Sequence, residues 1–289
     1  MVAEPAVSMA RRSMFFEDFA VGQHFVSEPR SVTEQDLTTF TDVSGDRHRL
    51  HTDAAYAESA GFDQPILQGP FGIAAFFGAF HDLHLADDSV IALLDTNWRY
   101  LAPIHVGDSL RFEFTIVGCR RTSSGDRGVV NRHVVVIDQH GDRVQEGTTG
   151  VLVRARDSGT DAPRHAFGTV PWGKAVAELL HADERFTKAT ADWDGAIGLR
   201  CGTSEVNLRI YRGAVIDVAR RVPHGPDYTF DTDELTWTQL VTGPRNDFMR
   251  RAMSGQFSVH GSGYEYLRTA RVLTFILDAA RALSKEGLS

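Results

Sequence analysis

The sequence is poor in cysteine and in long apolar runs, and each shortage excludes a class of protein. Only Cys119 and Cys201 occur among 289 residues, one in each half of the chain, so a disulfide-stabilised scaffold is excluded and two reduced thiols are expected. No apolar run approaches the roughly eighteen residues of a membrane helix, and the N-terminal residues lack the apolar core of a signal peptide. We therefore expect a cytoplasmic protein without a membrane span.

Positive charge is also in deficit. The chain carries 30 Lys and Arg against 38 Asp and Glu, a net charge of -8 with a pI near 5.8. Nucleic acid is therefore excluded as a general partner, while a local basic pocket for a phosphorylated ligand stays open. The sequence shows neither an internal repeat nor a low-complexity tract, which argues against a solenoid or an array.

The length and one shift in composition predict two domains. A chain of 289 residues exceeds what one typical core needs. At 154–170, Gly, Pro, Ser and charged residues replace the periodic pattern that precedes them. We predict a flexible tail at 1–14, a first domain at 15–154, a linker at 155–171 and a second domain at 172–289.

The first domain alternates between one apolar helix and several strands. A nearly all-apolar segment starts at Gly69-Pro70 and predicts a helix that is buried on most faces. A shorter helix, capped by Thr52 and Asp53, is expected through Ala60. Four runs rich in β-branched and aromatic residues predict antiparallel strands at 89–101, 108–121, 128–140 and 143–156. This pattern predicts an α+β fold with a sheet curled around a central helix and an edge strand that could pair in a homodimer.

The second domain also has an α+β pattern. Strand-like runs occupy 195–221, and alternation followed by a turn is expected at 227–243. The chain then closes with helices, the last of them amphipathic. Its apolar face is predicted to hold Leu267, Val272, Phe275, Ile276 and Ala279.

One segment of the first domain points to a family. Residues 44–69 read "SGDRHRLHTDAAYAESAGFDQPILQG", followed by "NWRYLAPIHVGDSL" and "GVVNRHVVVIDQHGDRV". The core of the pattern is an Asp, four residues, a His and then a Pro-Ile-x-x-Gly step. It resembles the MaoC-like dehydratases, the (R)-specific enoyl-CoA hydratases of hotdog fold, over roughly Phe15 to Arg154.

The resemblance implies an activity and a site. Asp46 and His51 would jointly bind and activate a water, which would add to a 2-enoyl thioester, or leave a 3-hydroxyacyl thioester in the reverse reaction. Burial of Asp46 would place two titratable groups in different protonation states at one site. The backbone N–H of Gly69 would stabilise the oxyanion. The loop at 120–128 would lie near the phosphates of CoA or of an acyl carrier protein, with Arg121 and Arg127 as contacts.

This chemistry requires no metal and no other cofactor. His81 and His84 lie three residues apart on the apolar helix, but the sequence offers no third ligand at metal-binding spacing beside them.

Three positions depart from the usual pattern of the family, which has Asn-Pro at 48–49 and His-Gly at 68–69. His48 is expected to replace a residue that orients the water, and so to contact substrate or water. Arg49 would bring a permanent cation near Asp46. Gln68 lies next to the substrate but leaves the Gly69 N–H intact.

The second domain resembles the sterol carrier protein 2-like (SCP2-like) domains. The resemblance rests on "RGAVIDV", "DYTFDTDELTWTQLVTG", "MRRAMSGQFSVHGSGYEYL" and the closing helix. It implies a site for an acyl or other hydrophobic group. A domain that only packs against its neighbour or forms a dimer is the alternative. In its loops, Arg245 and Asp247 form either a surface ion pair or part of a site.

Together these features predict a hydratase or dehydratase of acyl thioesters. Two alternatives remain open at this point. A hotdog scaffold could serve as a cyclase or isomerase of a natural-product intermediate, or the departures around Asp46 could have left a catalytically silent acyl-binding protein.

Overall fold

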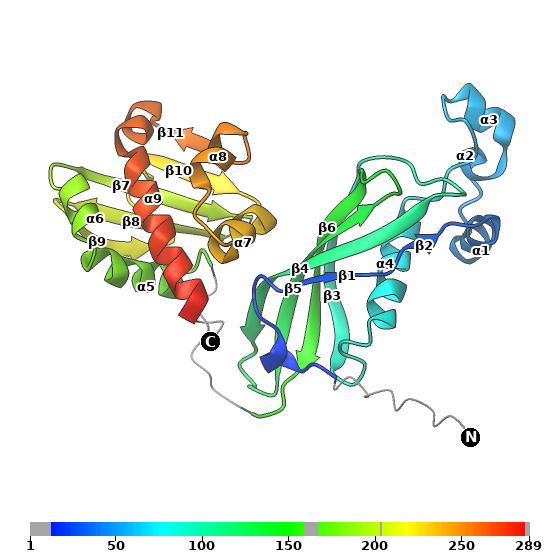
Figure 1. Cartoon of the computed structure of the whole chain (residues 1–289), viewed down its shortest axis with the longest axis horizontal. Helices are drawn as coiled ribbons and strands as arrows, with labels where there is room; N and C mark the ends of the chain where they lie inside the picture. The colour runs from blue at the N-terminus through cyan, green and yellow to red at the C-terminus, as the bar shows by residue number, and fades with distance from the viewer. Residues whose placement is uncertain (1–12, 159–166, 203, 287–289) are drawn as a thin grey trace, which may run out of the picture. The chain divides into compact units, whose positions relative to one another are not determined.

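The computed structural model describes residues 13–158, 167–202 and 204–286 and divides them into two compact units (Figure 1). The first unit contains most residues up to Ser158, and the second contains the described residues from Phe167 onward. Residues 1–12 of the predicted tail and 159–166 of the predicted linker lie outside the described residues. Ser13 and Met14 were assigned to the tail, but both hydrogen-bond to the segment 85–89 of the first unit.

A six-stranded sheet forms the body of the first unit. Its main path runs β1-β4-β5-β6-β3, with β2 paired to the end of β4. The β1–β4, β2–β4, β5–β6 and β3–β6 pairs are all antiparallel. The strands are β1 His24–Val26, β2 Arg30–Ser31, β3 Val90–Tyr100, β4 Ser109–Arg121, β5 Arg127–Ile137 and β6 Arg143–Arg154. The four strands predicted from the sequence are confirmed to within a few residues.

Helix α4 (Pro70–Asp82) packs against this sheet and completes the hotdog arrangement (Figure 1). Proline occupies its first turn, where the missing N–H leaves no bond unmade. Phe76 is fully buried, and its ring lies 5.9 Å from that of Phe114 on β4. The prediction that α4 is buried on most faces is wrong, because Ala74 and Gly78 are exposed on the side that does not face the sheet.

Short helices precede α4. They are η1 (Phe16–Asp18), α1 (Glu34–Ser44), α2 (Arg49–Thr52) and α3 (Ala54–Ser59). Thr33 and Asp36 form a capping box at the start of α1. The short helix predicted through Ala60 is confirmed as α3, and the Asp53 carboxylate accepts from the Tyr56 N–H to cap it, whereas Thr52 is the last residue of α2 and not a cap of α3.

The second unit contains a five-stranded sheet in the order β11-β10-β7-β8-β9. The β7–β8–β9 meander is antiparallel, whereas β10 runs parallel to β7. Its strands are β7 Asp194–Cys201, β8 Ser204–Tyr211, β9 Ala214–Ala219, β10 Tyr228–Thr232 and β11 Ser258–Gly261. Its helices are α5 Val170–His181, α6 Glu184–Ala189, α7 Glu234–Thr242, α8 Phe248–Met253 and α9 Gly263–Glu286.

Two predictions for the second unit need correction. The segment after β10 is a helix, α7, because Asp233 accepts from the Thr236 N–H and caps it. On α9, Phe275 and Ile276 are buried as expected, but Leu267 is 76% exposed and lies off the buried face. In the described ranges, no helix combines the length and apolarity needed to cross a membrane.

Candidate active site

Asp46 lies in the turn between α1 and α2. Helix α1 ends at Gly45, whose φ of 71° is a left-handed conformation that glycine adopts without strain. The Asp46 N–H then donates to Ser44 Oγ, and Asp46 Oδ1 accepts from the His48 N–H at 3.2 Å. These bonds hold one oxygen of the carboxylate in the turn and leave Oδ2 directed at His51.

His51 is held in one orientation by a backbone carbonyl. Its Nδ1 lies 2.7 Å from the Ile66 carbonyl oxygen, which can only accept, so Nδ1 carries a proton. Nε2 lies 3.6 Å from Asp46 Oδ2. That separation is long for a direct hydrogen bond and suits two side chains that both hydrogen-bond to a third group between them. The structure therefore brings together the two residues that the sequence pairs.

The two side chains differ in exposure. The His51 side chain is 11% exposed, and that of Asp46 is 49% exposed. The expectation that Asp46 is buried is therefore wrong for the single chain.

His48 and Arg49 take parts that the sequence did not predict. His48 Nδ1 accepts from the Leu50 N–H and caps α2, while its ring centre lies 6.2 Å from that of His51. Arg49 was expected to act on Asp46, but its guanidinium binds Asp53 at 2.7 Å instead. This hydrogen bond lowers the pKa of Asp53. The role of His48 toward substrate or water stays a prediction.

Gln68 ties the Asp46 turn to the rest of the unit. Its side chain is 1% exposed, and its Nε2 donates to Thr41 Oγ1 at 2.8 Å and to the Asp46 carbonyl oxygen at 3.1 Å. Thr41 lies on α1 and is itself buried. Gln68 therefore links α1, the Asp46 turn and the start of α4, and its predicted substrate contact stays untested.

Gly69 lies at the N-terminal end of α4, immediately before Pro70. In the described part of the chain, its N–H has no hydrogen-bond acceptor. Its φ of -49° and ψ of -48° are open to any residue, so backbone strain does not explain the glycine. A Cβ added here would lie 3.1 Å from the ring of Tyr100. Close approach of another group is thus the physical reason for a glycine at this position.

Two residues that no sequence pattern indicates, Gln145 and Trp98, hold Gly69. Gln145 Nε2, on β6, donates to the Gly69 carbonyl oxygen at 3.1 Å, and Gln145 Oε1 accepts from Trp98 Nε1 at 2.8 Å. The sequence gives little signal for Gln145, because its half of the strand, "RVQEGTTG", is mostly polar. Its partner is also 76 residues away in the sequence, and only the folded sheet brings the two together.

The structure does not bring Arg121 and Arg127 to this site within one chain. Both flank the hairpin between β4 and β5, whereas Gln145 lies at the opposite end of β6. Arg127 pairs with the last residue of β6, nine residues from Gln145, which is about 30 Å along a strand. Arg127 also binds Asp126 at 2.6 Å. The phosphate contact of both arginines remains a prediction.

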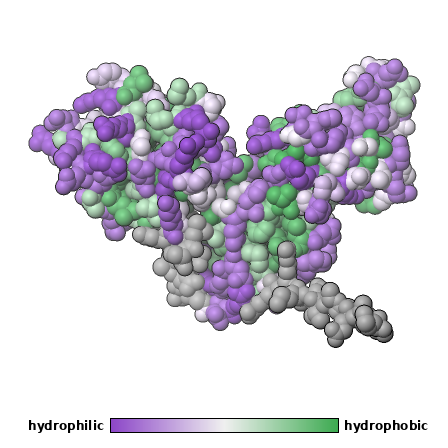
Figure 2. All heavy atoms as spheres, in the orientation of Figure 1, coloured by the Kyte–Doolittle hydropathy of each residue, from purple (hydrophilic) through white to green (hydrophobic). Residues whose placement is uncertain are grey.

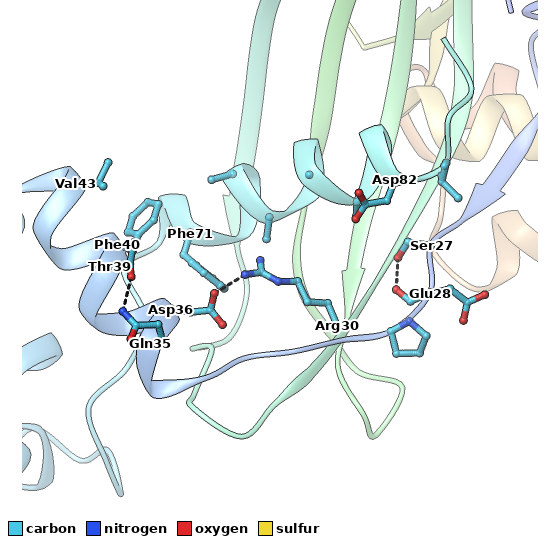
Figure 3. Close-up of a pocket in the computed structure, with 16 residues that line it drawn as sticks. Ser27, Glu28, Arg30, Gln35, Asp36, Thr39, Phe40, Val43, Phe71 and Asp82 are labelled. Atoms are coloured by element: carbon cyan, nitrogen blue, oxygen red, sulfur yellow. Dashed lines mark hydrogen bonds and ion pairs between the residues drawn. The ribbon is translucent and has the colours of Figure 1, made fainter. Parts of the chain in front are cut away.

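A groove of about 880 Å³ lies beside α4, on a side away from the sheet (Figure 3). Helix α1, the segment 27–30 and the exposed small residues of α4 line it. Arg30 binds Asp36 and lies over the Phe71 ring, 5.3 Å from its centre. Asp46, His51 and Gly69 are not among the lining residues.

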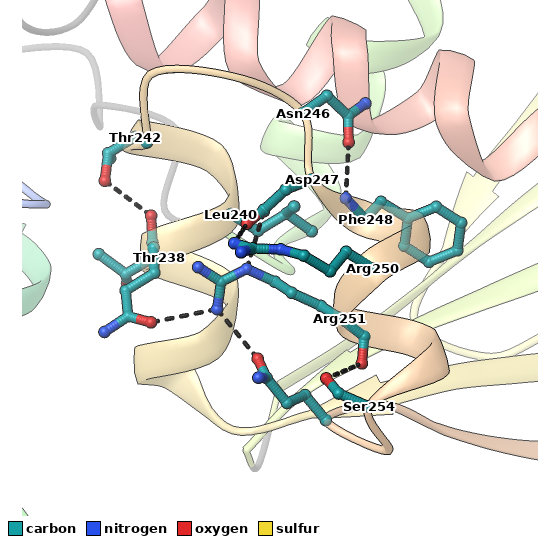
Figure 4. Close-up of polar contacts among 12 residues, drawn as sticks. Thr238, Leu240, Thr242, Asn246, Asp247, Phe248, Arg250, Arg251 and Ser254 are labelled. Carbon is teal, nitrogen blue, oxygen red and sulfur yellow. Dashed lines mark hydrogen bonds and ion pairs between the residues drawn. The ribbon is translucent and has the colours of Figure 1, made fainter.

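Asp247, in the loop at 244–248 of the second unit, is the centre of a structural ion-pair cluster (Figure 4). Asp247 binds Arg250 at 2.5 Å and Arg251 at 2.8 Å, and Arg251 also reaches Gln239 and Gln256. The predicted pair with Arg245 is replaced by these two partners. Burial opposes ionisation of Asp247, yet the two guanidinium groups outweigh it and lower its pKa. The cluster anchors α8.

The antiparallel sheet packed around α4 is the arrangement of a hotdog domain, and the segment that carries Asp46 and His51 is tied to the start of that helix through Gln68. The profile of the family described as "MaoC like domain" matches residues 18–139. This part of the chain is therefore similar to the MaoC-like domains.

Named relatives share this region. Beta-methylmalyl-CoA dehydratase of Chloroflexus aurantiacus is 30% identical over 169 residues, which are 57% of this chain and 47% of the relative. Mesaconyl-CoA hydratase of Cereibacter sphaeroides is 27% identical over 168 residues, 57% of this chain and 48% of the relative. The solved structure of a MaoC domain protein from Chloroflexus aurantiacus J-10-fl is 26% identical, with a TM-score of 0.51 over 66% of this chain and 58% of that one. The matched part spans about half the length of the two curated relatives.

Proposed function

We propose that this protein is a hydratase or dehydratase that interconverts 2-enoyl and 3-hydroxyacyl thioesters. The observation that carries the proposal is the pair formed by Asp46 Oδ2 and His51 Nε2 at 3.6 Å, with the Gly69 N–H at the start of α4 left without an acceptor among the described residues. The named relatives are a dehydratase and a hydratase of CoA thioesters, which supports CoA as the carrier. An acyl carrier protein is the alternative carrier.

The chemistry follows from the positions of the donors and acceptors. A water held between Asp46 and His51 loses a proton to one of them, and its oxygen adds to C3 of the enoyl group. Negative charge moves to the thioester oxygen, where the Gly69 N–H and the positive end of α4 stabilise it. The proton-bearing member of the pair then supplies a proton to C2. Because the Ile66 carbonyl fixes the Nδ1 proton, Nε2 is the atom of His51 that exchanges protons.

We further propose that the first unit forms a homodimer through β3. This strand lies at the edge of the sheet and pairs only with β6 among the described strands. Its apolar side chains are exposed in the single chain, among them Leu93 at 48% and Leu94 at 49%. Apolar residues also reach the surface of the first unit over its strands in Figure 2. A long apolar edge of this kind favours pairing with a second copy.

The second unit is proposed to be an SCP2-like domain that holds a hydrophobic acyl group. Support comes from its mixed α+β sheet and from an aromatic cluster in its core. Phe230 stacks on Phe257 with ring centres 4.4 Å apart, and Trp237 lies beside both. A hydrophobic ligand would find apolar and aromatic surface in such a core.

The test of the catalytic proposal is the loss of enone absorbance on a panel of 2-enoyl-CoA thioesters. Wild type is compared with Asp46→Asn and His51→Ala. Asp42→Asn is a matched control, because Asp42 also lies near the turn but forms an exposed pair with Arg47. We expect the first two variants to lose at least about a hundredfold in kcat and the control to keep its rate.

The alternatives give different results in the same experiment. Wild type that turns over no thioester of any chain length refutes CoA-ester hydration. In that case, acyl-CoA affinity that survives both Asp46→Asn and His51→Ala favours a silent acyl-binding protein. Conversion of another substrate class that depends on Asp46 favours the cyclase or isomerase.

A further inference from the structure

A charged side chain lies inside the first unit, between α4 and the sheet. Arg132 on β5 is 1% exposed, and its Nε donates to Thr149 Oγ1 at 3.0 Å. Its Nη1 and Nη2 atoms are buried, and neither has a hydrogen-bond partner among the residues that the structure describes. A guanidinium carries five N–H donors, so most of its capacity is left unused.

Four phenylalanine rings surround this guanidinium and supply no acceptor oxygen. Its carbon lies 4.5 Å from the ring centre of Phe80, 5.3 Å from that of Phe76 and 6.0 Å from those of Phe77 and Phe114. Contacts with ring faces offset only part of the cost of burying a cation. Burial lowers the pKa of Arg132 to about 10, so the group stays protonated at neutral pH. A buried cation without an anion destabilises a fold, which indicates a purpose other than stability.

The sheet register relates this cation to the proposed catalytic site. Tyr100 on β3 pairs with Gln145 on β6, and both touch Gly69, one through space and one through a hydrogen bond. This row marks the catalytic end of the concave face. The next row on the same face, two residues along each strand, pairs Trp98 with Gly147.

The third row is polar. Thr96 on β3 pairs with Thr149 on β6, which pairs with Arg132 on β5. Thr96 is exposed at the edge strand, and Thr149 is fully buried. A line of two hydroxyls therefore leads from the edge of the sheet to the guanidinium. Thr149 lies four residues from Gln145, about 14 Å along the strand.

Positions along α4 give a second measure of the distance between Gly69 and the Arg132 guanidinium. Phe76, against which the guanidinium lies, follows Gly69 by seven residues, a rise of about 10 Å. The Phe80 ring, which lies nearest the guanidinium, follows Gly69 by eleven residues, a rise of about 16 Å, so the guanidinium lies roughly 10–16 Å from the proposed oxyanion donor along α4. An extended acyl chain advances about 1.3 Å per carbon–carbon bond, so about eight to twelve bonds cover the distance.

We propose that Arg132 recognises a carboxylate at the far end of the acyl group, and that the preferred substrates are thioesters of medium-chain dicarboxylic acids. This inference deepens the proposed function and rests on it. The phenylalanine rings would pack along the methylene chain, and the two Nη atoms would donate to the two carboxylate oxygens in the bidentate geometry that guanidinium favours. The thioester would then place its C2 and C3 atoms beside Asp46 and His51.

The test compares 2-enoyl-CoA thioesters of about ten carbons that end either in a carboxylate or in a methyl group. We expect wild type to favour the carboxylate-ended substrate in kcat/KM by about tenfold to a hundredfold, the range of a charge-assisted hydrogen-bonded pair. Arg132→Met should abolish that preference, mainly through KM, while it keeps turnover of the methyl-ended substrate. Arg132→Lys should restore part of the preference. Arg111→Met is the matched control, because Arg111 forms an exposed pair with Glu113.

Binding of the saturated forms of both thioesters, measured by calorimetry, separates this inference from the catalytic proposal. These ligands cannot be hydrated, so a carboxylate preference that Arg132→Met removes supports the inference even if no enoyl-CoA is turned over. Hydration of the methyl-ended substrate by wild type, with no preference for the carboxylate in rate or in binding, refutes the inference and leaves the hydratase standing. Thermal unfolding of Arg132→Met shows whether this variant folds. If it does not fold, Arg132→Lys provides the test: it must retain part of the preference for the carboxylate-ended substrate, and complete loss of the preference in a folded Arg132→Lys variant refutes the inference.

Discussion

Replacement of Gly69 by alanine separates two reasons for a glycine: a backbone conformation that other residues avoid, and the close approach of another group. The backbone of Gly69 is right-handed helical, with φ -49° and ψ -48°, and alanine adopts this conformation readily. The added methyl group would lie 3.1 Å from the Tyr100 ring. Tyr100 is 53% exposed, so its ring can move by the few tenths of an ångström that are needed. We therefore expect Gly69→Ala to fold.

The expected changes in stability and activity differ greatly in size. Loss of backbone freedom in the unfolded chain stabilises an alanine variant by about 0.4–1 kcal/mol, and crowding against Tyr100 offsets about as much. The melting temperature should therefore change by no more than a few degrees. The methyl group, however, would occupy the space beside the N–H where the thioester oxygen must approach. Loss of one oxyanion donor typically costs about a hundredfold to a thousandfold in kcat.

The assay measures kcat and KM for enoyl-CoA hydration together with thermal unfolding. Gly78→Ala is the control, since Gly78 lies on the same helix and a Cβ there would meet nothing within 4 Å. We expect this control to keep its rate and to gain slightly in stability. Gly69→Ala with a rate within about threefold of wild type would contradict the oxyanion role. A variant that failed to fold would contradict the steric argument.

Three further predictions concern the parts around the site. Gln68→Leu should destabilise the first unit by about 1–3 kcal/mol and lower kcat, because the buried Thr41 hydroxyl and the Asp46 carbonyl lose their hydrogen-bond donor. Denaturant unfolding measures the stability and a hydration assay measures kcat. A kcat equal to that of wild type would show that the Gln68 hydrogen bonds do not position Asp46. The carboxylate of Asp247 has a lowered pKa, so its contribution to stability is present above the ordinary carboxyl range and is lost as pH falls through the folded value. Asp247→Asn should therefore lower the free energy of unfolding at pH 7 by about 1–3 kcal/mol, and the gap between variant and wild type should shrink in acid, where the wild-type carboxylate becomes protonated. A gap in unfolding free energy that does not change with pH would contradict the stabilising role of the ionised Asp247. Lysine at both Leu93 and Leu94 should convert the proposed dimer to a monomer in sedimentation analysis, and an unchanged mass would place the dimer interface elsewhere.

Much of the fold followed from local patterns. The strands of the first domain are long, β-branched and separated by polar turns, so their existence and their antiparallel pairing could be predicted. Helix α7 could not be predicted in the same way, because the alternating run at 228–232 continues into a segment of moderate hydropathy that does not distinguish strand from helix. The change to helix occurs at Asp233, whose side chain caps α7. The prediction for Leu267 failed because helical periodicity gives a face but not what covers it.

The site was predicted in part for a similar reason. Asp46 and His51 are five residues apart, so one tight turn brings them together, and the sequence pattern identifies the pair. Arg49 was placed near Asp46 by the same proximity, yet the i,i+4 geometry of a helix turns it toward Asp53. Local spacing thus limits which residues can meet, while helix geometry selects which of them do.

By itself, the sequence determined the two α+β halves, the apolar helix that begins at Gly69 and the Asp46–His51 pair. Each depends on interactions within a few residues, which composition and periodicity record. Only the tertiary structure decided that Gln145 holds Gly69, that Gln68 holds the Asp46 turn, and that the Nη atoms of Arg132 are buried under α4 with no partner among the described residues. These three contacts depend on the register of strands and on packing between segments distant in the sequence, where no local pattern specifies the partner.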